Sequence, residues 1–83
     1  MATKIGRVLH YYDKIGVAVV ELAENLSVGE KIRFARGGED LFDQSVSSMQ
    51  SEHEEIETAK SGEIVGLKVD QPVKEGAEVL KEE

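Results

Sequence analysis

Two histidines and a pair of adjacent tyrosines are the side chains of this chain best suited to chemistry. His10 and His53 are the only histidines, and the sequence has no cysteine. A zinc site needs three or four ligands, and a hydrolytic triad needs a nucleophile on an exposed turn. Neither pattern accompanies His10 or His53, and the two glutamates that follow His53 are typical of a charged loop. We therefore expect no catalytic site, no metal site and no enzymatic activity.

The glycines do not form a nucleotide-binding loop. Such a loop has the order Gly-x-x-x-x-Gly-Lys-Ser/Thr, because its backbone amides must surround the phosphates. None of the eight glycines stands in that order. The sequence therefore predicts neither a bound nucleotide nor another cofactor.

Tyr11 and Tyr12 fall in a predicted loop over residues 10–14. Exposed aromatic side chains often mark contact surfaces, and stacking combined with the positive charge of Lys14 suits looped or single-stranded RNA. The alternative is that one of the two rings closes an end of the fold. We treat Tyr11, Tyr12 and Lys14 as candidate binding residues.

A second candidate is a basic strip formed by Lys31, Arg33 and Arg36. Residues 31–35 alternate, which places Ile32 and Phe34 inward and Lys31, Arg33 and Ala35 outward. The strip is interpreted either as a phosphate-binding surface or as an edge strand protected by charge.

The charge is distributed unevenly. The net charge is −7, with six basic against four acidic side chains in residues 1–36 and four against thirteen in residues 37–83. Affinity for nucleic acid depends on Lys and Arg, so the total argues against a general nucleic-acid binder. The acidic half favours a protein partner or is simply a solvated surface.

The strongest strand signal follows the turn at Gly62. Val65, Leu67 and Val69 share one face, and Gly66 between them leaves room for another backbone or a bulge. Residues 15–22 are apolar on both faces until Glu21, which suits either a strand covered on both sides or a strand that crosses a barrel. Further strands are expected at residues 4–9, 31–35, 41–49 and 78–81, with a hairpin tip at residues 37–38.

Residues 43–59 are ambiguous. Val46, Met49, His53 and Ile56 have helical spacing, and Ser51 with Glu54 matches a capping box. The surrounding strands favour a strand to about residue 49 followed by a loop. We keep the helix over residues 50–58 as the alternative.

These elements predict one domain over residues 1–83, an all-β, six-stranded antiparallel Greek-key barrel. The lack of cysteine fits a cytoplasmic protein, and the apolar runs are too short for a signal peptide or a membrane span.

Four ordered segments resemble the second, β-barrel domain of the translational GTPases, the elongation factor Tu and initiation factor two families. They are Ile-Gly-Arg-Val (5–8), Leu-Ser-Val-Gly-Glu-Lys-Ile (26–32), Ala-Lys-Ser-Gly-Glu-Ile-Val-Gly-Leu (59–67) and Val-Lys-Glu-Gly-Ala-Glu-Val-Leu (73–80). Residues 14–22 and 46–53 are closer to stand-alone translation elongation factor-like proteins. The same stretch resembles the C-terminal module of collagenase-like peptidases, some of which act in RNA modification.

The resemblance implies a barrel that contacts RNA, the ribosome or a neighbouring domain and has no activity of its own. Glu21 matches the elongation factor pattern, but Leu22 stands where that pattern has arginine, so aminoacyl-tRNA recognition is not implied. Our leading hypothesis is a non-catalytic, translation elongation factor-like binding module associated with RNA or the ribosome. The alternative is an accessory module that docks on an RNA-modification enzyme or another protein.

Overall fold

Every regular element in the described part of the chain, residues 2–52 and 54–82 of a computed structural model, is a β-strand. The strands are β1 (Ala2–Tyr12), β2 (Val17–Leu22), β3 (Leu26–Ser27), β4 (Lys31–Arg36), β5 (Glu39–Ser45), β6 (Met49–Ser51), β7 (Glu54–Ile56), β8 (Thr58–Ala59), β9 (Ile64–Lys68) and β10 (Glu78–Glu82). The predicted all-β class is confirmed. The six predicted strands correspond to β1, β2, β4, β5, β9 and β10, and the other four strands have two or three residues each.

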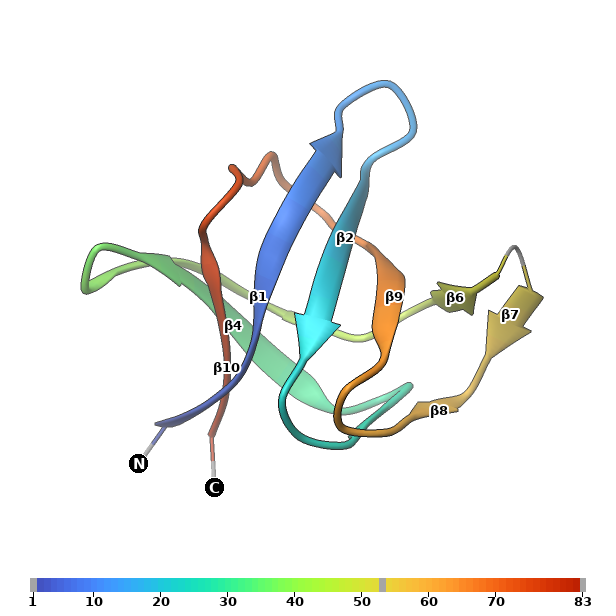
Figure 1. The fold of residues 1–83 in the computed structure, drawn as a ribbon. Coiled ribbons are helices and arrows are strands. Elements are labelled where there is room, and N and C mark those ends of the chain that lie inside the picture. Colours follow the sequence, from blue (N-terminus) through green and yellow to red (C-terminus); the bar gives the residue numbers. More distant parts are fainter. Residues whose placement is uncertain (1, 53, 83) are drawn as a thin grey trace.

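One antiparallel sheet forms most of the fold. Its strand order is β5-β4-β10-β1-β2-β9-β6-β7, and β3 pairs with β8 in a separate two-stranded sheet. β5 lies at one end of this strand order and β6 lies near the other end. Because β6 follows β5 directly in the chain, these two sides of the sheet come together and the sheet curls into a barrel (Figure 1). The N- and C-terminal ends lie side by side, since Ala2 pairs with Glu82.

A buried glutamine joins β5 to the end of β9. The Gln44 side chain, only 6% exposed, donates from its amide nitrogen to the Lys68 carbonyl at 2.8 Å. Its amide oxygen accepts a hydrogen bond from the Asp70 backbone N–H at 2.8 Å. The Lys68 N–H donates in turn to the Ser48 carbonyl at 3.2 Å. The Gln44 side-chain amide thus takes the place of a pair of backbone hydrogen bonds between two strands. It closes the barrel between β5 and the end of β9.

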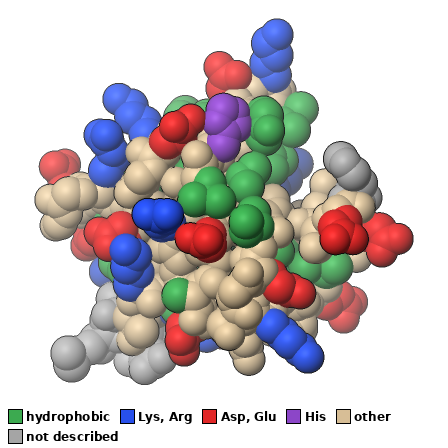
Figure 2. Space-filling view, viewed as in Figure 1, with side chains coloured by type: hydrophobic (Ala, Val, Ile, Leu, Met, Phe, Trp, Pro, Cys, Tyr) green, Lys and Arg blue, Asp and Glu red, His purple; other side chains and the backbone are tan. Residues whose placement is uncertain are grey.

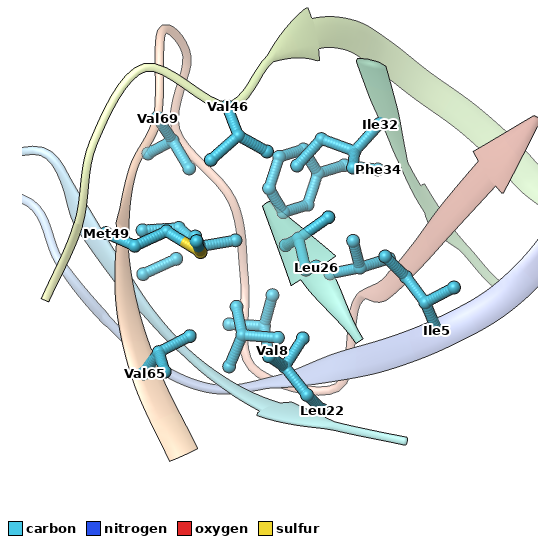
Figure 3. Close-up of a cluster of buried hydrophobic side chains, with 14 of the residues drawn as sticks. Ile5, Val8, Leu22, Leu26, Ile32, Phe34, Val46, Met49, Val65 and Val69 are labelled. Atoms are coloured by element: carbon cyan, nitrogen blue, oxygen red, sulfur yellow. The ribbon is translucent and has the colours of Figure 1, made fainter. Parts of the chain in front are cut away.

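The interior is filled by apolar side chains from all the long strands (Figure 3). Val65, Leu67 and Val69 point inward as predicted, and so do Ile32 and Phe34. On the face shown in Figure 2, charged side chains of both signs are scattered, with hydrophobic groups between them. A barrel of this size is closed by its own side chains, so binding must use the outer surface.

The predicted loop at residues 10–14 is wrong for residues 10–12 and correct for residues 13–14. β1 continues to Tyr12, and the chain reverses through residues 13–16, so Ile15 lies in a turn and not at the start of a strand. The register between β1 and β2 shifts between Val8 and His10. Pairing with β2 therefore extends β1 beyond the point where the apolar pattern ends.

The described residues between 50 and 58 form neither the alternative helix nor one continuous loop, because β6 and β7 lie there. β6 pairs with β7 on one side and with β9 on the other, so Ser51 faces Glu54 across a hairpin and cannot cap a helix with it. The free edge of β9 needs a hydrogen-bonding partner, and this requirement outweighs the helical spacing. His53, one of the residues that suggested the helix, lies outside the described residues.

Ala35, which was predicted to face outward, is only 3% exposed. It pairs with Glu78 on β10, next to the inward pair of Phe34 and Val79, so the alternation along β4 is kept and Ala35 is covered by its neighbours on the outer face. The register shift between Phe34 and Ala35 places the extra residue, Leu41, on β5. Arg36 keeps its predicted exposed position.

Candidate functional site

The predicted basic strip lies on β4 opposite acidic side chains of β5. Arg33 holds Asp43 with two hydrogen bonds, Nε to Oδ1 at 2.7 Å and Nη2 to Oδ2 at 3.2 Å. Its Nη1 also lies 3.5 Å from Asp40 Oδ2. The hydrogen bond from Arg33 lowers the pKa of the Asp43 carboxyl below its usual value. The Arg33 guanidinium is therefore engaged within the protein before any phosphate could approach it.

The other members of the strip are exposed and also lie near acids. Lys31 is close enough to Asp43 to help lower its pKa, after the larger effect of Arg33. Arg36 faces Glu39 across the β4–β5 hairpin. The structure thus groups Lys31, Arg33 and Arg36 as predicted but places carboxylates beside them, which reduces their attraction for an anionic ligand.

Further ion pairs cancel cationic charge around the barrel. Lys4 lies 3.2 Å from Glu78, Arg7 lies 3.5 Å from Glu21, and Lys81 lies 3.0 Å from Glu30. At Glu30, partial burial works to raise the pKa, but hydrogen bonds from Lys81 and the Ser27 backbone outweigh it and lower the pKa overall. Such surface pairs contribute little to stability.

The two tyrosines have different environments. Tyr11 is half-buried and packs against the core, whereas Tyr12 is 49% exposed. The Tyr12 ring meets His10 edge to face at a centroid distance of 4.4 Å, and His10 Nδ1 lies 2.9 Å from Glu75 Oε2. Lys14 is exposed in the adjoining turn. The structure therefore brings Tyr12 and Lys14 to one end of the barrel, while Tyr11 serves the core.

An apolar groove on the outer surface was not identified from the sequence. We call it the β2–β9 groove. It has a volume of about 270 Å³ and is lined mainly by Tyr12, Ile15, Val17, Val19, Gln50, Glu52, Ile64 and Gly66. Ile15 and Ile64 are 65% and 52% exposed. In Figure 2 hydrophobic side chains gather beside the histidine drawn in purple, over the front strands.

The floor of the groove depends on Gly66. A Cβ atom at this position would lie 3.1 Å from the Cγ1 atom of Val17, tighter than most real contacts. Gly66 was predicted to leave room for another backbone or a bulge, but the register of β9 against β2 is regular and the tight neighbour is the Val17 side chain. A larger residue here would fill the groove.

The sequence did contain a signal for this groove. Residues 15–22 are apolar on both faces and were predicted either to be covered on both sides or to cross a barrel. In the structure Ala18, Val20 and Leu22 enter the core, while Val17 and Val19 face outward and remain partly exposed. The predicted outer cover is not supplied by the described part of the chain.

Two further hollows have more polar linings than the β2–β9 groove. One, of about 330 Å³, is lined by Ile5, Glu24, Asn25, Ser61 and Lys81. The other, of about 290 Å³, is lined by Arg36, Glu39, Leu41, Pro72, Val73 and Lys74. Over residues 2–52 and 54–82, no three His, Cys, Asp or Glu side chains converge to hold a metal ion. The same residues include no helix long and apolar enough to cross a membrane.

The described residues form a small β-barrel whose interior is filled by its own side chains. The profile described as "Peptidase family U32 C-terminal domain" matches residues 2–77. The chain therefore belongs to the family of U32 peptidase C-terminal domains. This agrees with the resemblance to the C-terminal module of collagenase-like peptidases, while the resemblance to elongation factor Tu stays a prediction.

Individual relatives support this membership. The chain is 41% identical over 81 residues to "Uncharacterized protease MJ0090" of Methanocaldococcus jannaschii, covering 95% of this chain but only 20% of the relative. It thus spans about a fifth of that protein's length. Two crystal structures of the C-terminal domain of a Geobacillus thermoleovorans putative U32 peptidase superpose closely. The selenomethionine variant has a TM-score of 0.88 at 25% identity, over 95% of this chain and 99% of that one. The second has a TM-score of 0.87 at 26% identity, over 96% and 92%.

Proposed function

We propose that this chain is a non-catalytic accessory module that docks on the larger part of a U32-family protein, within one polypeptide or between two. The observation that carries the proposal is the uncovered apolar outer face of β2 and β9. An apolar surface of this kind on a small domain commonly marks a protein interface. The relative's remaining length, four-fifths of it, supplies a candidate for the missing cover.

The absence of catalysis in this proposal is supported by the way the polar groups are used. His10 is exposed and paired with Glu75, and the buried Gln44 amide is consumed by backbone hydrogen bonds. Neither group lines any of the three hollows described above, so neither is placed beside a substrate there. The module therefore acts through its surface.

The proposal can be tested with a full-length chimera, in which this chain replaces the equivalent C-terminal module of the Methanocaldococcus jannaschii relative. Hydroxyl-radical footprinting read by mass spectrometry would compare the chimera with the isolated chain. Docking predicts that one face of the module becomes protected in the chimera. Equal labelling of every side chain in the two samples would overturn the proposal, because the module would then be independent of the rest.

A second candidate function, RNA contact, is favoured by the exposed Tyr12 ring beside His10 and Lys14 at one end of the barrel. Aromatic stacking next to a lysine suits unpaired bases and their phosphates. Amide-shift titration with tRNA and ribosomal RNA fragments, at low salt and near physiological salt, would test it. Shifts around Tyr12 and Lys14 that weaken with salt would support it, and no shifts even at low salt would end it.

A further inference from the structure

The outer surface of β2 and β9 has the character of an interior surface. In an antiparallel barrel with one wetted face, strand residues alternate between apolar inside and polar outside. β2 departs from this rule, since Val17 and Val19 point outward while Ala18 and Val20 point inward. On β9, Ile64 points outward beside them at 52% exposure. This surface therefore has the side chains expected beneath a second layer of protein.

The shape of the surface favours a specific contact over a flat one. Tyr12 at the end of β1 and Ile15 in the turn after it form one wall of the β2–β9 groove, and the β6–β7 hairpin contributes Gln50 and Glu52 as the other. Gly66 provides the low floor between the walls. A groove of about 270 Å³ is large enough for one or two inserted side chains of a partner.

Charge distinguishes the two sides of the groove. The β6–β7 hairpin and the residue after it carry four exposed glutamates, Glu52, Glu54, Glu55 and Glu57. In Figure 2 acidic side chains gather on the side where Figure 1 places β7. The side chains of Lys14 and Lys68, at the end of the groove near the β1–β2 turn, are exposed. A complementary partner would therefore place positive charge against the hairpin.

We infer that the β2–β9 groove is the surface through which the module binds the larger part of a U32-family protein. The partner segment inserts apolar side chains between Ile15 and Ile64 and sets Lys or Arg side chains against the glutamates of the β6–β7 hairpin. This inference rests on the proposed function and adds the face and the chemistry of the contact. It requires the groove, and not the other two hollows, to become covered.

The test uses the footprinting comparison between the chimera and the isolated chain, read residue by residue. Protection should be confined to Tyr12, Ile15 and Ile64. Leu41 and Val28, which are 43% and 41% exposed outside the groove, should remain as reactive as in the isolated chain. Protection of another face would overturn the inference and leave the proposed function standing. Protection of no face would overturn both.

Matched variants of the chimera test the apolar part of the contact. Ile15→Glu and Ile64→Glu each place a charge in the groove and should restore labelling of Tyr12 to the level seen in the isolated chain. Leu41→Glu makes the same change at an exposed residue of another hollow and should leave Tyr12 protected. Retained protection in both groove variants would contradict the inference. Thermal unfolding of each isolated variant confirms that the barrel is still folded.

The charged part is tested by reversing two glutamates. Glu52→Lys with Glu54→Lys should weaken protection at least several-fold at low salt, whereas Glu24→Lys with Glu39→Lys changes the net charge equally but away from the groove. Equal protection in the two double variants would show that the hairpin charge does not contribute. The partner would then be apolar only, and the stated chemistry would be wrong.

Discussion

The outer surfaces of β4–β5 and of β2–β9 differ in how completely the chain satisfies its own side chains. On β4–β5, Arg33 is held by Asp43 and Asp40, so charges on one strand find partners on the next. On β2–β9, Val19 and Ile64 face solvent with no apolar layer above them in the described part of the chain. The side chains of the β4–β5 surface thus find their partners within the module. In our proposal, the apolar side chains of the β2–β9 surface are covered by another protein layer.

The contrast changes how the basic strip is interpreted. Alternating lysine and arginine on an exposed strand suggested a phosphate-binding surface, but the register places acids of β5 directly opposite. Charged side chains that have nearby partners lose part of their attraction for a third group. The more informative signal was β2, which is apolar on both faces. Packing inside the barrel explains its inward apolar side chains but not the outward ones, Val17 and Val19.

The largest effect is expected from the inner side of β9. Leu67 is 1% exposed and pairs with residues of both β2 and β6. Leu67→Ala should lower the free energy of unfolding by about 3 kcal/mol, since it removes buried methyl groups and leaves a cavity. Urea unfolding would show a lower midpoint with an unchanged slope. A loss below about 1 kcal/mol would mean that the inner and outer faces of β9 are not as different as the structure indicates.

The second largest effect is expected at the residue that joins the two surfaces. Gln44→Ala removes both hydrogen bonds that link β5 to the end of β9 and leaves the Lys68 carbonyl and the Asp70 N–H without that partner. Because an unsatisfied buried polar group costs about 1–3 kcal/mol, a total loss of about 2 kcal/mol is expected in urea unfolding. Gln50→Ala, an exposed glutamine on β6, is the control and should change stability by less than about 0.5 kcal/mol.

Much of the barrel could be predicted from the sequence, for identifiable reasons. Ile32 with Phe34 and Val65 with Leu67 alternate with exposed residues, and period-two alternation is a local signal of a half-buried strand. Gly37 and Gly38 mark the hairpin tip because both adopt positive φ, 61° and 82°.

The features that were missed depend on contacts between distant residues. The closure by Gln44 joins positions that are 24 and 26 residues apart, and no local pattern marks one glutamine for that role. The β6–β7 hairpin exists because β9 needs a neighbour. The groove is formed by residues of one turn, three strands and the β6–β7 hairpin, so no single segment of the sequence predicts it. The two apolar faces of residues 15–22 were the one local indication of an apolar outer surface.

A smaller effect is expected from the ion pair on β4–β5. The hydrogen bond from Arg33 lowers the pKa of Asp43 from its ordinary value of 3.8, so the ionised carboxylate stabilises the folded state. This stabilisation is complete at pH values above the unfolded-state pKa and is lost as pH falls through the lower folded-state pKa. Asp43→Asn should therefore reduce the urea midpoint slightly at pH 7, and the difference between the two proteins should begin to shrink only as the pH falls below about 4.

A matched background separates this pair from a general effect of charge. When Arg33→Gln is already present, adding Asp43→Asn should have a smaller effect at pH 7, because the main cause of the pKa shift has been removed. A difference between wild type and Asp43→Asn that stays constant from pH 7 to pH 2 would contradict the assignment. The β4–β5 surface would then not be completed by this pair.

The smallest effect on folding is expected where we propose the largest effect on docking. Ile15 is 65% exposed in the turn after β1, so Ile15→Glu removes little buried area and should change the free energy of unfolding by less than about 0.5 kcal/mol. Urea unfolding of the isolated chain measures this value, and footprinting of the chimera measures docking by the same variant. A destabilisation comparable to that of Leu67→Ala would show that Ile15 serves the barrel itself. Near-neutral stability combined with lost docking would separate the two faces, since the inner side chains hold the module together and the outer ones act only on its partner.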